Sequence, residues 1–466
     1  MEEFIDVCTL GLELTKYLAV VLFFMNGERF DVIIVGGGIT GTSLLYLLSN
    51  YTDIKKILLI EKYDSLAPLN SSSRNNSQTL HFGDIETNYS LDKAKKTKKA
   101  AEIVLRYTEA LPTSERKKVI AKCQKMVLAV GDRELESMDK VYSKGMRELF
   151  PGLKKLGKKE IARVEPNIVK GRDPEEKIGA LLSDKGYMVD FGQLTRSFGS
   201  RSKKSKSRIM INTKAVRIEK DGGEYSVITT KGNFSARFVV FATGAYSLYF
   251  AKSLGYEKNL SILSVAGNFY VSKRVLNGKV YRMQTEGIPF AAIHGDPDIT
   301  NSKITRFGPT VTLPLQLERH KNDTMLDYIK TFDIDLATMA SLKRILFNKD
   351  IQRILSRNIS YYLPIIGKEL FLRNEAGKIV PSLRAQDLVF ANDQGGIRPQ
   401  VIDEKKGFLV IGESKIVEDG IIFNITPSPG ASSSLANSLE DVGKIAKYLG
   451  SSVDSKELNR KLLKSY

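Results

Sequence analysis

The chain has 466 residues, a formal net charge of +18, 42% hydrophobic residues and 27% charged residues, a globular composition that excludes wholesale disorder. It has two cysteines and three histidines, so we expect neither a disulfide framework nor a metal site. Any histidine-based chemistry must use His81, His294 or His320. The sequence has no zinc-finger, RNA-binding or leucine-zipper motif, so we expect no nucleic-acid partner. The excess of cations therefore suits an anionic membrane surface, anionic substrates or plain solvated surface.

An N-terminal extension, residues 1–25, precedes the first structured element. It contains an apolar run over residues 17–25, behind the acidic residues Glu2, Glu3 and Asp6. The run is shorter than the roughly 20 residues that span a bilayer, and targeting peptides begin with basic residues instead. We expect a membrane-interfacial segment, or an extension upstream of a true start at Met25.

A βαβ unit follows this extension. Residues 30–35 form an apolar, β-branched run that predicts a buried parallel strand. A glycine-rich turn comes next, then a predicted helix over residues 43–50 and a second buried strand over residues 56–61. This order of strand, glycine turn, helix and strand is typical of a dinucleotide-binding domain.

The glycine spacing has a physical role in such a site. Gly36 permits the tight turn, Gly38 lets the backbone approach a pyrophosphate, and Gly41 lets helix and strand pack closely. Glu61, at the end of the second strand, would accept hydrogen bonds from a ribose diol and repel a 2′-phosphate. The pattern therefore argues against NADP.

Three further segments favour FAD. An antiparallel meander over residues 213–236 precedes a strand that ends at Thr243 and Gly244, an arrangement typical of flavoproteins. A Ser/Asn-rich loop over residues 71–78 offers hydroxyl and amide groups for ribityl and phosphate oxygens. Gly430 opens the last helix, whose N-terminus would face the flavin O2. We expect FAD contacts from Gly36, Gly38, Ile39, Thr40, Gly41, Glu61, Lys62, Ser72, Ser73, Asn76, Ser77, Gln78, Val216, Thr243, Gly244, Pro429, Gly430 and Ala431.

The nucleotide-type elements are spread along the chain, which predicts an α/β fold with an insertion. We expect a three-layer, Rossmann-type FAD-binding domain made of residues 26–120, 185–260 and 395–466. Residues 121–184 and 261–394 should form an inserted α+β substrate domain on an antiparallel sheet. A basic stretch over residues 201–208 reads as a loop, and residues 90–109 read as a helix with a lysine stripe over residues 93–99.

Longer motifs carry a family resemblance. The segments over residues 75–89, 294–298, 306–310, 396–400 and 424–433 resemble a compact subgroup of the FAD-dependent malate:quinone oxidoreductases, within the D-amino-acid-oxidase-like flavoproteins. The resemblance covers about residues 30–450. It implies oxidation of (S)-malate to oxaloacetate in the tricarboxylic acid cycle, with electrons passing through FAD to membrane quinone. It also implies peripheral attachment to a respiratory membrane, either the bacterial cytoplasmic or the mitochondrial inner membrane, with the lysine stripe and the basic loop as candidate contacts.

Oxidation of a secondary alcohol needs a base, and histidine is the natural one near neutral pH. His294 is the first candidate, since Gly295 and Pro297 should fix it on a tight loop, and His81 is its rival, in a segment near the flavin ring in relatives. His320 should lie on a solvated surface helix.

The two carboxylates of malate call for cations. Arg398 and Arg306 are the candidates, and both lie in motifs shared with relatives. Tyr270 and Gln78 should add polar contacts. The alternatives are a related 2-hydroxyacid dehydrogenase or oxidase, such as one for L-2-hydroxyglutarate, and a flavin-binding scaffold without turnover. A scaffold would need only the FAD-binding residues, so the presence of both histidines and both arginines argues against it.

Overall fold

A computed structural model describes residues 27–284, 292–332, 343–344, 347–410, 414–425 and 430–463 of the chain. Its centre is a mainly parallel sheet with the strand order β20-β21-β11-β1-β2-β8. The strands β2 and β21 and the last four residues of β1 and of β11 are apolar runs buried on both faces, as expected for a parallel sheet, whereas the edge strands β8 and β20 are partly exposed. In the order of the sheet, the bounds of these strands are Ser414–Glu418, Ile421–Ile425, Gly232–Phe241, Glu28–Val35, Ile57–Ile60 and Ser207–Met210.

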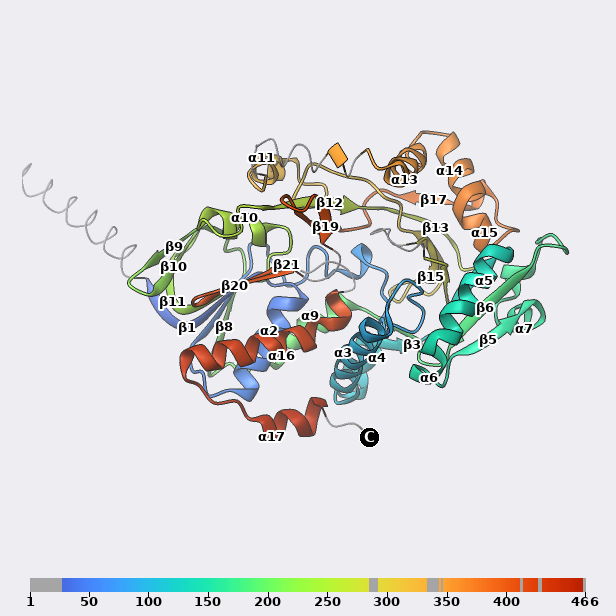
Figure 1. Cartoon of the computed structure of the whole chain (residues 1–466). Coiled ribbons are helices and arrows are strands. Elements are labelled where there is room, and N and C mark those ends of the chain that lie inside the picture. Colours follow the sequence, from blue (N-terminus) through green and yellow to red (C-terminus); the bar gives the residue numbers. More distant parts are fainter. Residues whose placement is uncertain are drawn as a thin grey trace, which may run out of the picture.

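Helices cover one face of this central sheet, and a meander with one helix covers the other (Figure 1). The first of these faces packs against the helices α2 (Ile39–Tyr51), α3 (Leu91–Glu109), α9 (Phe191–Arg201) and α16 (Gly430–Leu449). The opposite face packs against β9 (Ala215–Asp221), β10 (Glu224–Thr229) and α10 (Tyr246–Ser253). The three layers confirm the predicted Rossmann-type architecture.

A second sheet lies beside the first, with the order β17-β13-β16-β15-β14-β4-β6-β5. All its pairs are antiparallel except β14 with β4, which run parallel. The sheet draws on two separate stretches of chain, and its strands are Val389–Ala391, Phe269–Lys273, Ile304–Gly308, His294–Pro297, Lys279–Arg282, Lys125–Val130, Ile178–Ser183 and Lys154–Gly157. This is the mainly antiparallel second sheet expected from the sequence.

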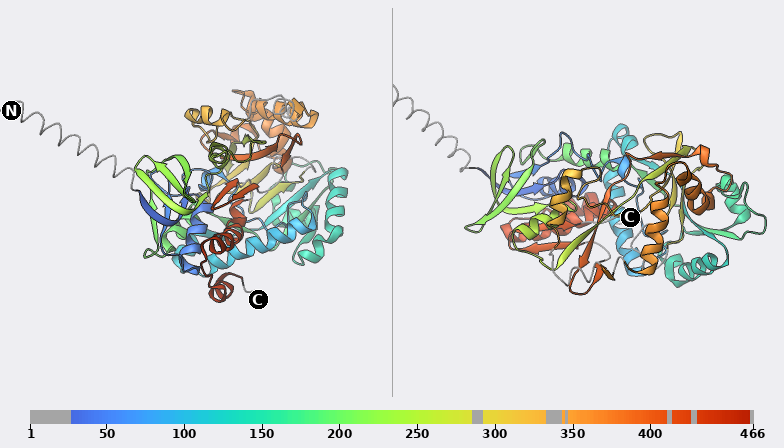
Figure 2. Two further views of the ribbon diagram at one scale, coloured as in Figure 1. Left: turned by 60° about the vertical axis from the view of Figure 1, so that its left-hand side comes forward. Right: turned by 90° about the horizontal axis from the view of Figure 1, so that it is seen from above.

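A small three-stranded sheet connects the two large ones. It consists of β12 (Leu260–Ala266), β18 (Ile397–Asp403) and β19 (Phe408–Val410). Helix α13 (Lys349–Ser360) lies on its outer side, where Ile351, Ile354 and Leu355 pack against Val265 and Ile402. Figure 2 shows this layer from two further directions.

Shorter elements complete the described part. The strands β3 (Ile120–Lys122) and β7 (Tyr187–Val189) pair with each other. The remaining α-helices are α4 (Thr113–Val119), α5 (Asp132–Val141), α6 (Arg147–Leu149), α7 (Lys158–Val164), α8 (Pro166–Val169), α11 (Met325–Ile329), α14 (Ile366–Phe371), α15 (Gly377–Ile379) and α17 (Ser455–Leu458). None of the helices within these described ranges is long and apolar enough to cross a membrane.

The structure corrects two local predictions. Helix α2 begins at Ile39 rather than at residue 43, because Gly38 already serves as its N-cap. The basic stretch 201–208 is not a plain loop: it begins at the end of α9, and its last residues start β8, which pairs with β2. Its cations bind oxygen atoms of the chain, as in the pair of Arg208 with Glu28 and the bond from Lys206 to the carbonyl oxygen of Thr52.

The predicted N-terminal extension, residues 1–25, lies outside the described residues.

Candidate active site

A cavity opens where three parallel strands end. Its wall includes the residues that follow β1, β2 and β11, and it continues to the first residues of β18 and α16. The carboxyl ends of parallel strands are the usual place for ligands in such sheets. The lining thus joins segments that are more than 300 residues apart in sequence.

The turn between β1 and α2 has the geometry that its glycines predict. Gly36 has φ +111°, and a Cβ on Gly41 would lie 2.0 Å from the carbonyl oxygen of Gly36. Gly38 caps α2 without a side-chain hydrogen bond, and both Gly38 and Thr40 line the cavity. The first turn of α2 therefore presents backbone N–H groups and a positive dipole end to the cavity, which suits a pyrophosphate.

Glu61 lines the cavity at the end of β2. Its Oε2 accepts a hydrogen bond from the Gly37 amide at 2.7 Å, and its Oε1 accepts one from the Tyr63 amide at 2.9 Å. Burial raises the pKa of Glu61, against the pull of these amides. Lys62 also lines the cavity and pairs with Glu318 at 2.5 Å.

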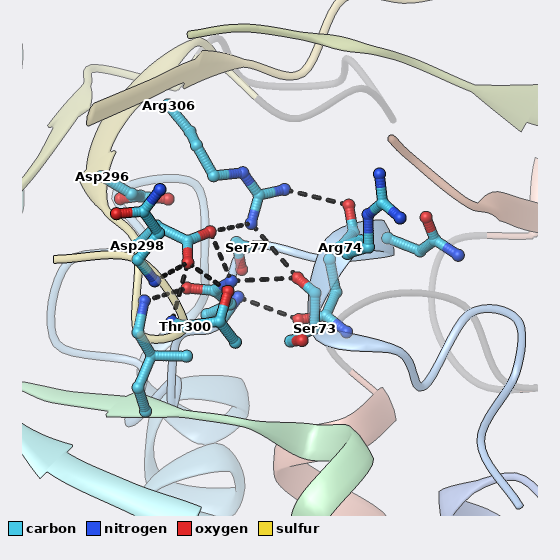
Figure 3. A network of polar contacts seen from close by, with 12 residues as sticks. Ser73, Arg74, Ser77, Asp296, Asp298, Thr300 and Arg306 are labelled. Atoms are coloured by element: carbon cyan, nitrogen blue, oxygen red, sulfur yellow. Dashed lines mark hydrogen bonds and ion pairs between the residues drawn. The ribbon is translucent and has the colours of Figure 1, made fainter. Parts of the chain in front are cut away.

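Arg306 and the side chain of Gln78 hold the Ser/Asn-rich loop by hydrogen bonds, and those from Arg306 to Ser73 and Arg74 can be followed in Figure 3. Arg306 donates to the carbonyl oxygens of Ser73 at 3.2 Å and Arg74 at 3.1 Å. The side-chain amide of Gln78 donates from Nε2 to the carbonyl oxygen of Ser73 at 3.0 Å and to Asp298 at 2.9 Å. Arg306 and Gln78 are almost fully buried, so both side chains support the loop rather than line the cavity.

On the cavity side, the loop shows a partly different set of residues from the predicted one. Asn76 and Ser77 line the cavity as expected, whereas Ser72 and Ser73 are not part of the wall. The sequence prediction missed Ser71 and Asn75, which do line it. The Ser71 hydroxyl also accepts a hydrogen bond from the Ile39 amide at 2.9 Å.

Two other predicted residues lie away from the wall. Val216 is exposed to solvent, and its predecessor Ala215 lines the cavity instead. Tyr270 is buried in the core of the second sheet, where its hydroxyl donates to the carbonyl oxygen of Tyr361 and its ring stacks on Phe371.

The remaining predicted FAD contacts lie after the end of β11 and at the start of α16. Thr243 and Gly244 line the cavity beyond β11, and Gly430 and Ala431 line it at the start of α16. Pro429 lies outside the described residues.

His81 is the histidine in the cavity wall. Its Nδ1 pairs with the buried Glu86, and its Nε2 lies 3.4 Å from the Ser77 hydroxyl. Burial alone would raise the pKa of Glu86, but His81 and Lys125 outweigh it, so that pKa lies below its ordinary value. A carboxylate on Nδ1 orients the imidazole and leaves Nε2 to exchange a proton.

His294 lies on the strand β15 and not on the tight loop that the sequence predicted, one ring further from the cavity than His81. Its Nδ1 lies 2.7 Å from Asp296, and its ring stacks on Tyr281 at 4.7 Å between centroids. Tyr281 also contacts His81 edge-on, at 6.1 Å between ring centroids. Burial lowers the pKa of His294, against the attraction of Asp296. A neutral imidazole is therefore favoured at this position.

A buried lysine connects this second pair to the Ser/Asn-rich loop. The Lys279 ammonium lies 3.4 Å from Asp296 and donates to the carbonyl oxygen of Ser77 at 2.8 Å. The sequence contained a signal for Asp296 as the partner of His294, because the two residues are two positions apart on a strand and so share a face.

The third histidine, His320, is exposed as expected, but it lies in a turn with φ +60° and not on the predicted helix.

Arg398 is a cation in the wall without a protein partner among the described residues. Lys214 also lines the cavity without a partner among them, but its side chain is exposed. Arg398 is the second residue of β18, it is half-buried, and within the described residues its guanidinium has no hydrogen bond or ion pair. Burial lowers its pKa. Asn70 fixes the start of β18, since its side chain exchanges two hydrogen bonds, at 2.8 and 3.1 Å, with the backbone of Ile397. The site thus holds a positioned guanidinium that is free to bind an anion.

The residues of the wall fit an FAD. The glycine turn and the first turn of α2 suit its pyrophosphate, and the Ser/Asn-rich loop offers hydroxyls and amides for the ribityl chain. At the other end, the 20-residue helix α16 begins with Gly430, Ala431 and Ser432 in the wall, where its dipole would favour negative charge on a flavin ring.

Comparison with known proteins agrees with this fit. Residues 31–436 match the family described as DAO, FAD dependent oxidoreductase. A solved structure of L-alpha-glycerophosphate oxidase from Mycoplasma pneumoniae with FAD bound superposes with a TM-score of 0.61 at 20% identity, over 91% of this chain and 96% of that one. Glycine oxidase from Geobacillus kaustophilus gives 0.61 at 17% identity, over 90% and 95%. These structures show the fold.

Relatives in sequence narrow the family. The probable malate:quinone oxidoreductase of Campylobacter jejuni is 39% identical over 94% of this chain and all of its own length. The malate:quinone oxidoreductase of Helicobacter pylori is 40% identical over 91% of this chain and 96% of its own. Human mitochondrial L-2-hydroxyglutarate dehydrogenase is more distant, at 25% identity over 88% and 87%. The chain belongs to the malate:quinone oxidoreductases, within the FAD-dependent oxidoreductase family.

Proposed function

We infer that this chain is an FAD-dependent enzyme that oxidises (S)-malate to oxaloacetate and delivers the electrons to quinone. The observation that carries this assignment in the structure is Arg398, a half-buried guanidinium in the cavity wall with no partner among the described residues. A dicarboxylate substrate would supply that partner, in a bidentate pair that sets orientation as well as charge. Bound FAD supplies the chemistry of hydride acceptance and electron delivery.

His81 is the better candidate for the base in this geometry. The sequence placed His294 first, but His81 lines the cavity and His294 lies behind Tyr281. Glu86 holds the Nδ1 of His81, so Nε2 would take the proton of the malate hydroxyl. His294, Asp296 and Lys279 then support the ring of Tyr281 and the carbonyl of Ser77.

Arg306, Gln78 and Tyr270 have other roles in this proposal. Arg306 and Gln78 position the Ser/Asn-rich loop against the cofactor, and Tyr270 stabilises the core of the second sheet. We assign none of these three side chains to the substrate. The same geometry supports a FAD-binding unit of residues 26–120, 185–260 and 395–466, with residues 121–184 and 261–394 as the substrate-side unit.

The test of the function is a substrate screen on the purified, FAD-loaded protein without oxygen. Malate should bleach the visible flavin absorbance, and a quinone analogue should restore it. L-2-hydroxyglutarate should bleach it much more slowly. Absence of bleaching with malate would overturn the assignment, and faster bleaching with L-2-hydroxyglutarate would transfer it to that substrate.

The test of the base compares two variants. His81→Ala should lose malate-driven bleaching by about 100-fold or more, the usual size of a general-base effect, while it retains FAD. His294→Ala should lose less and retain FAD. The reverse order of the two losses would return the role of base to His294.

We also propose that the protein attaches peripherally to an anionic respiratory membrane, because its quinone acceptor is a lipid-soluble molecule. The enzyme must then present one surface to the bilayer.

A further inference from the structure

The exposed apolar side chains of the protein are concentrated in one short stretch. Of the sixteen large hydrophobic side chains exposed in the described ranges, nine lie within residues 315–366. They form what we call the apolar face: Leu315, Met325, Leu326, Ile329, Phe347, Ile359, Leu363, Ile365 and Ile366. Single exposed apolar residues are ordinary, but a cluster of this kind marks a surface that something covers.

The elements that carry the apolar face lie on one side of the molecule. Helix α11 and the helices α13 and α14 are at the top in Figure 1 and stay there after rotation about the vertical axis in Figure 2. The lysine-rich helix α3 lies in the lower half in both views.

The most prominent residue of this face is held in a strained turn. Ile365 has φ +67° and ψ −63°, and the Ile366 amide donates to the carbonyl oxygen of Pro364 at 2.7 Å. This is the γ-turn with positive φ, a rare conformation that is unfavourable for a β-branched residue. Yet the side chain that it presents is 91% exposed. The turn holds an isoleucine out into its surroundings.

Cations lie along the edge of the apolar face. Lys330 follows Ile329, Lys349 follows Phe347 by two residues, and Lys368 follows Ile366 by two. Acidic residues lie beside them, and Lys330 pairs with Asp327 at 3.6 Å, but the described residues of 315–369 hold nine Lys or Arg against five Asp or Glu. All three lysines are exposed. An apolar centre with a basic border complements the headgroup and acyl boundary of an anionic bilayer.

The position of the face also suits electron delivery to a lipid-soluble acceptor. The inner side of α13 packs on the sheet of β12 and β18, and β18 carries Arg398 in the cavity wall. One layer of helix and one of sheet therefore separate this part of the surface from the cavity.

We propose that the apolar face inserts into the interfacial region of an anionic bilayer, with Ile365 and Leu326 at the deepest points. This proposal rests on the assignment of quinone as the electron acceptor. It locates the membrane contact on α11 and the α13–α14 turn rather than on the lysine stripe of α3 or the N-terminal extension.

The experiment uses the full-length, FAD-loaded enzyme and vesicles of phosphatidylcholine with phosphatidylglycerol. The variant Leu326→Glu/Ile365→Glu should bind these vesicles at least about tenfold more weakly than wild type, since each change puts a carboxylate in place of inserted apolar surface. The matched control, Ile211→Glu/Val417→Glu, adds the same charge at two exposed apolar positions elsewhere and should bind within about twofold of wild type, because neither site contacts lipid.

Two activities separate docking from chemistry. Malate should bleach the flavin of all three proteins at the same rate, whereas reduction of quinone in the vesicles should fall in step with binding for Leu326→Glu/Ile365→Glu. A different result would separate the two proposals: Leu326→Glu/Ile365→Glu binds the vesicles weakly, but malate bleaches the flavin of none of the proteins, wild type included. That result would remove the proposed function and leave the docking surface in place.

Two other results would overturn the proposal. Wild-type binding by Leu326→Glu/Ile365→Glu, with weakened binding by Lys95→Glu/Lys99→Glu, would move the contact to α3. The other result concerns the oligomeric state. If wild type is a dimer, Leu326→Glu/Ile365→Glu is a monomer and both bind vesicles equally, the apolar face is an interface between two copies of the chain.

Discussion

Arg398 and Arg306 come from similar motifs but have different surroundings. Arg306 donates to two backbone carbonyls and lies 3.4 Å from Asp298, so its binding capacity is largely used inside the protein. Arg398 has no such partner among the described residues and lines the cavity. A cation without a partner in a cavity wall is a better candidate for ligand binding than a buried one whose donors are mostly bound inside the protein.

Replacement of Arg398 tests this difference directly. Arg398→Gln should lower kcat/KM for malate by about 10- to 100-fold, the size of a lost charged hydrogen bond, at unchanged FAD content. Arg398→Lys should recover only part of it, because an ammonium cannot form the bidentate pair. Arg384→Gln, at an exposed arginine, is the matched control and should behave as wild type. Equal kinetics of Arg398→Gln and the control would exclude a substrate contact.

His294 makes stability depend on pH. Its pKa in the folded protein lies below the ordinary value of 6.5, so the unfolded chain takes up the proton first as the pH falls. The contribution of His294 to stability is therefore complete above about pH 6.5 and decreases below it. Relative to His294→Asn, wild type should lose up to about 1.4 kcal/mol of unfolding free energy per pH unit in this window.

Urea unfolding of the two proteins at a series of pH values measures this difference. In wild type, His294 and Lys279 hold the pKa of Asp296 below the ordinary value of 3.8 in spite of burial, so the stability that depends on this carboxylate is lost at lower pH. Parallel curves for wild type and His294→Asn between about pH 5 and about pH 7 would contradict the prediction.

For single residues, the sequence predicted the positions within the glycine motif better than the direction in which a strand side chain points. Gly36, Gly38 and Glu61 line the cavity as predicted, since a glycine turn between two strands has few possible shapes. Tyr270 lies instead in a core, because the direction of a strand side chain depends on register, which the sequence does not specify.

Among elements, the turn after β1 and the helix α2 approach each other closely in the site. The Gly36 carbonyl oxygen lies where a Cβ on residue 41 would be, at 2.0 Å. Both groups belong to backbone, so neither can move without a shift of the whole helix. The glycine spacing in the sequence was sufficient to predict this contact.

Gly41→Ala should therefore move α2 and weaken FAD retention, with a stability loss of about 1–3 kcal/mol, typical of overpacking. Gly443→Ala is the matched control, because it lies exposed in α16 with nothing within 4 Å of a new Cβ. It should stabilise the helix by about 0.5–1 kcal/mol. FAD content and thermal unfolding measure both effects, and equal behaviour of the two variants would contradict the predicted clash.

The same scale shows where sequence patterns failed. Strand β8 begins inside the basic stretch 201–208, whose composition is typical of a loop. It forms because β2 has a free parallel edge that accepts Ser207–Met210. Local composition does not contain this information, since the partner strand lies about 150 residues earlier in the sequence.

At the scale of the whole molecule, the cavity joins three distant parts of the chain. Its wall takes residues from 35–81, from 191–250 and from 396–432, with Glu318 beside them. A ligand in this position holds all of these segments in the folded state and binds none of them when they are unfolded. Cofactor binding should thus stabilise the whole protein, not one domain.

FAD removal followed by titration tests this coupling. At free FAD about a hundredfold above its dissociation constant, the free energy of unfolding should rise by about 2.7 kcal/mol. The unfolding temperature should increase with FAD concentration in a single transition. A second transition whose temperature does not change with FAD concentration would show that the second sheet unfolds independently.

The overall arrangement was more predictable than its details. The order of nucleotide-type segments in the sequence predicted a Rossmann-type fold with inserted sequence, because parallel strands need crossover connections. The apolar face was not predicted, because exposure is a property of the assembled molecule and its residues resemble core residues in the sequence.

The parallel pair of β14 with β4 has a consequence for synthesis of the protein. Lys125–Val130 and Lys279–Arg282 lie side by side in the second sheet, although about 150 residues separate them. On the ribosome, β4 can pair early with β6, which follows it by some 50 residues, but its other edge stays open until β14 emerges. At about 5–20 residues per second, that edge waits many seconds for its partner. Nascent chains of this protein therefore pass through an interval in which chaperones have an unpaired strand to protect.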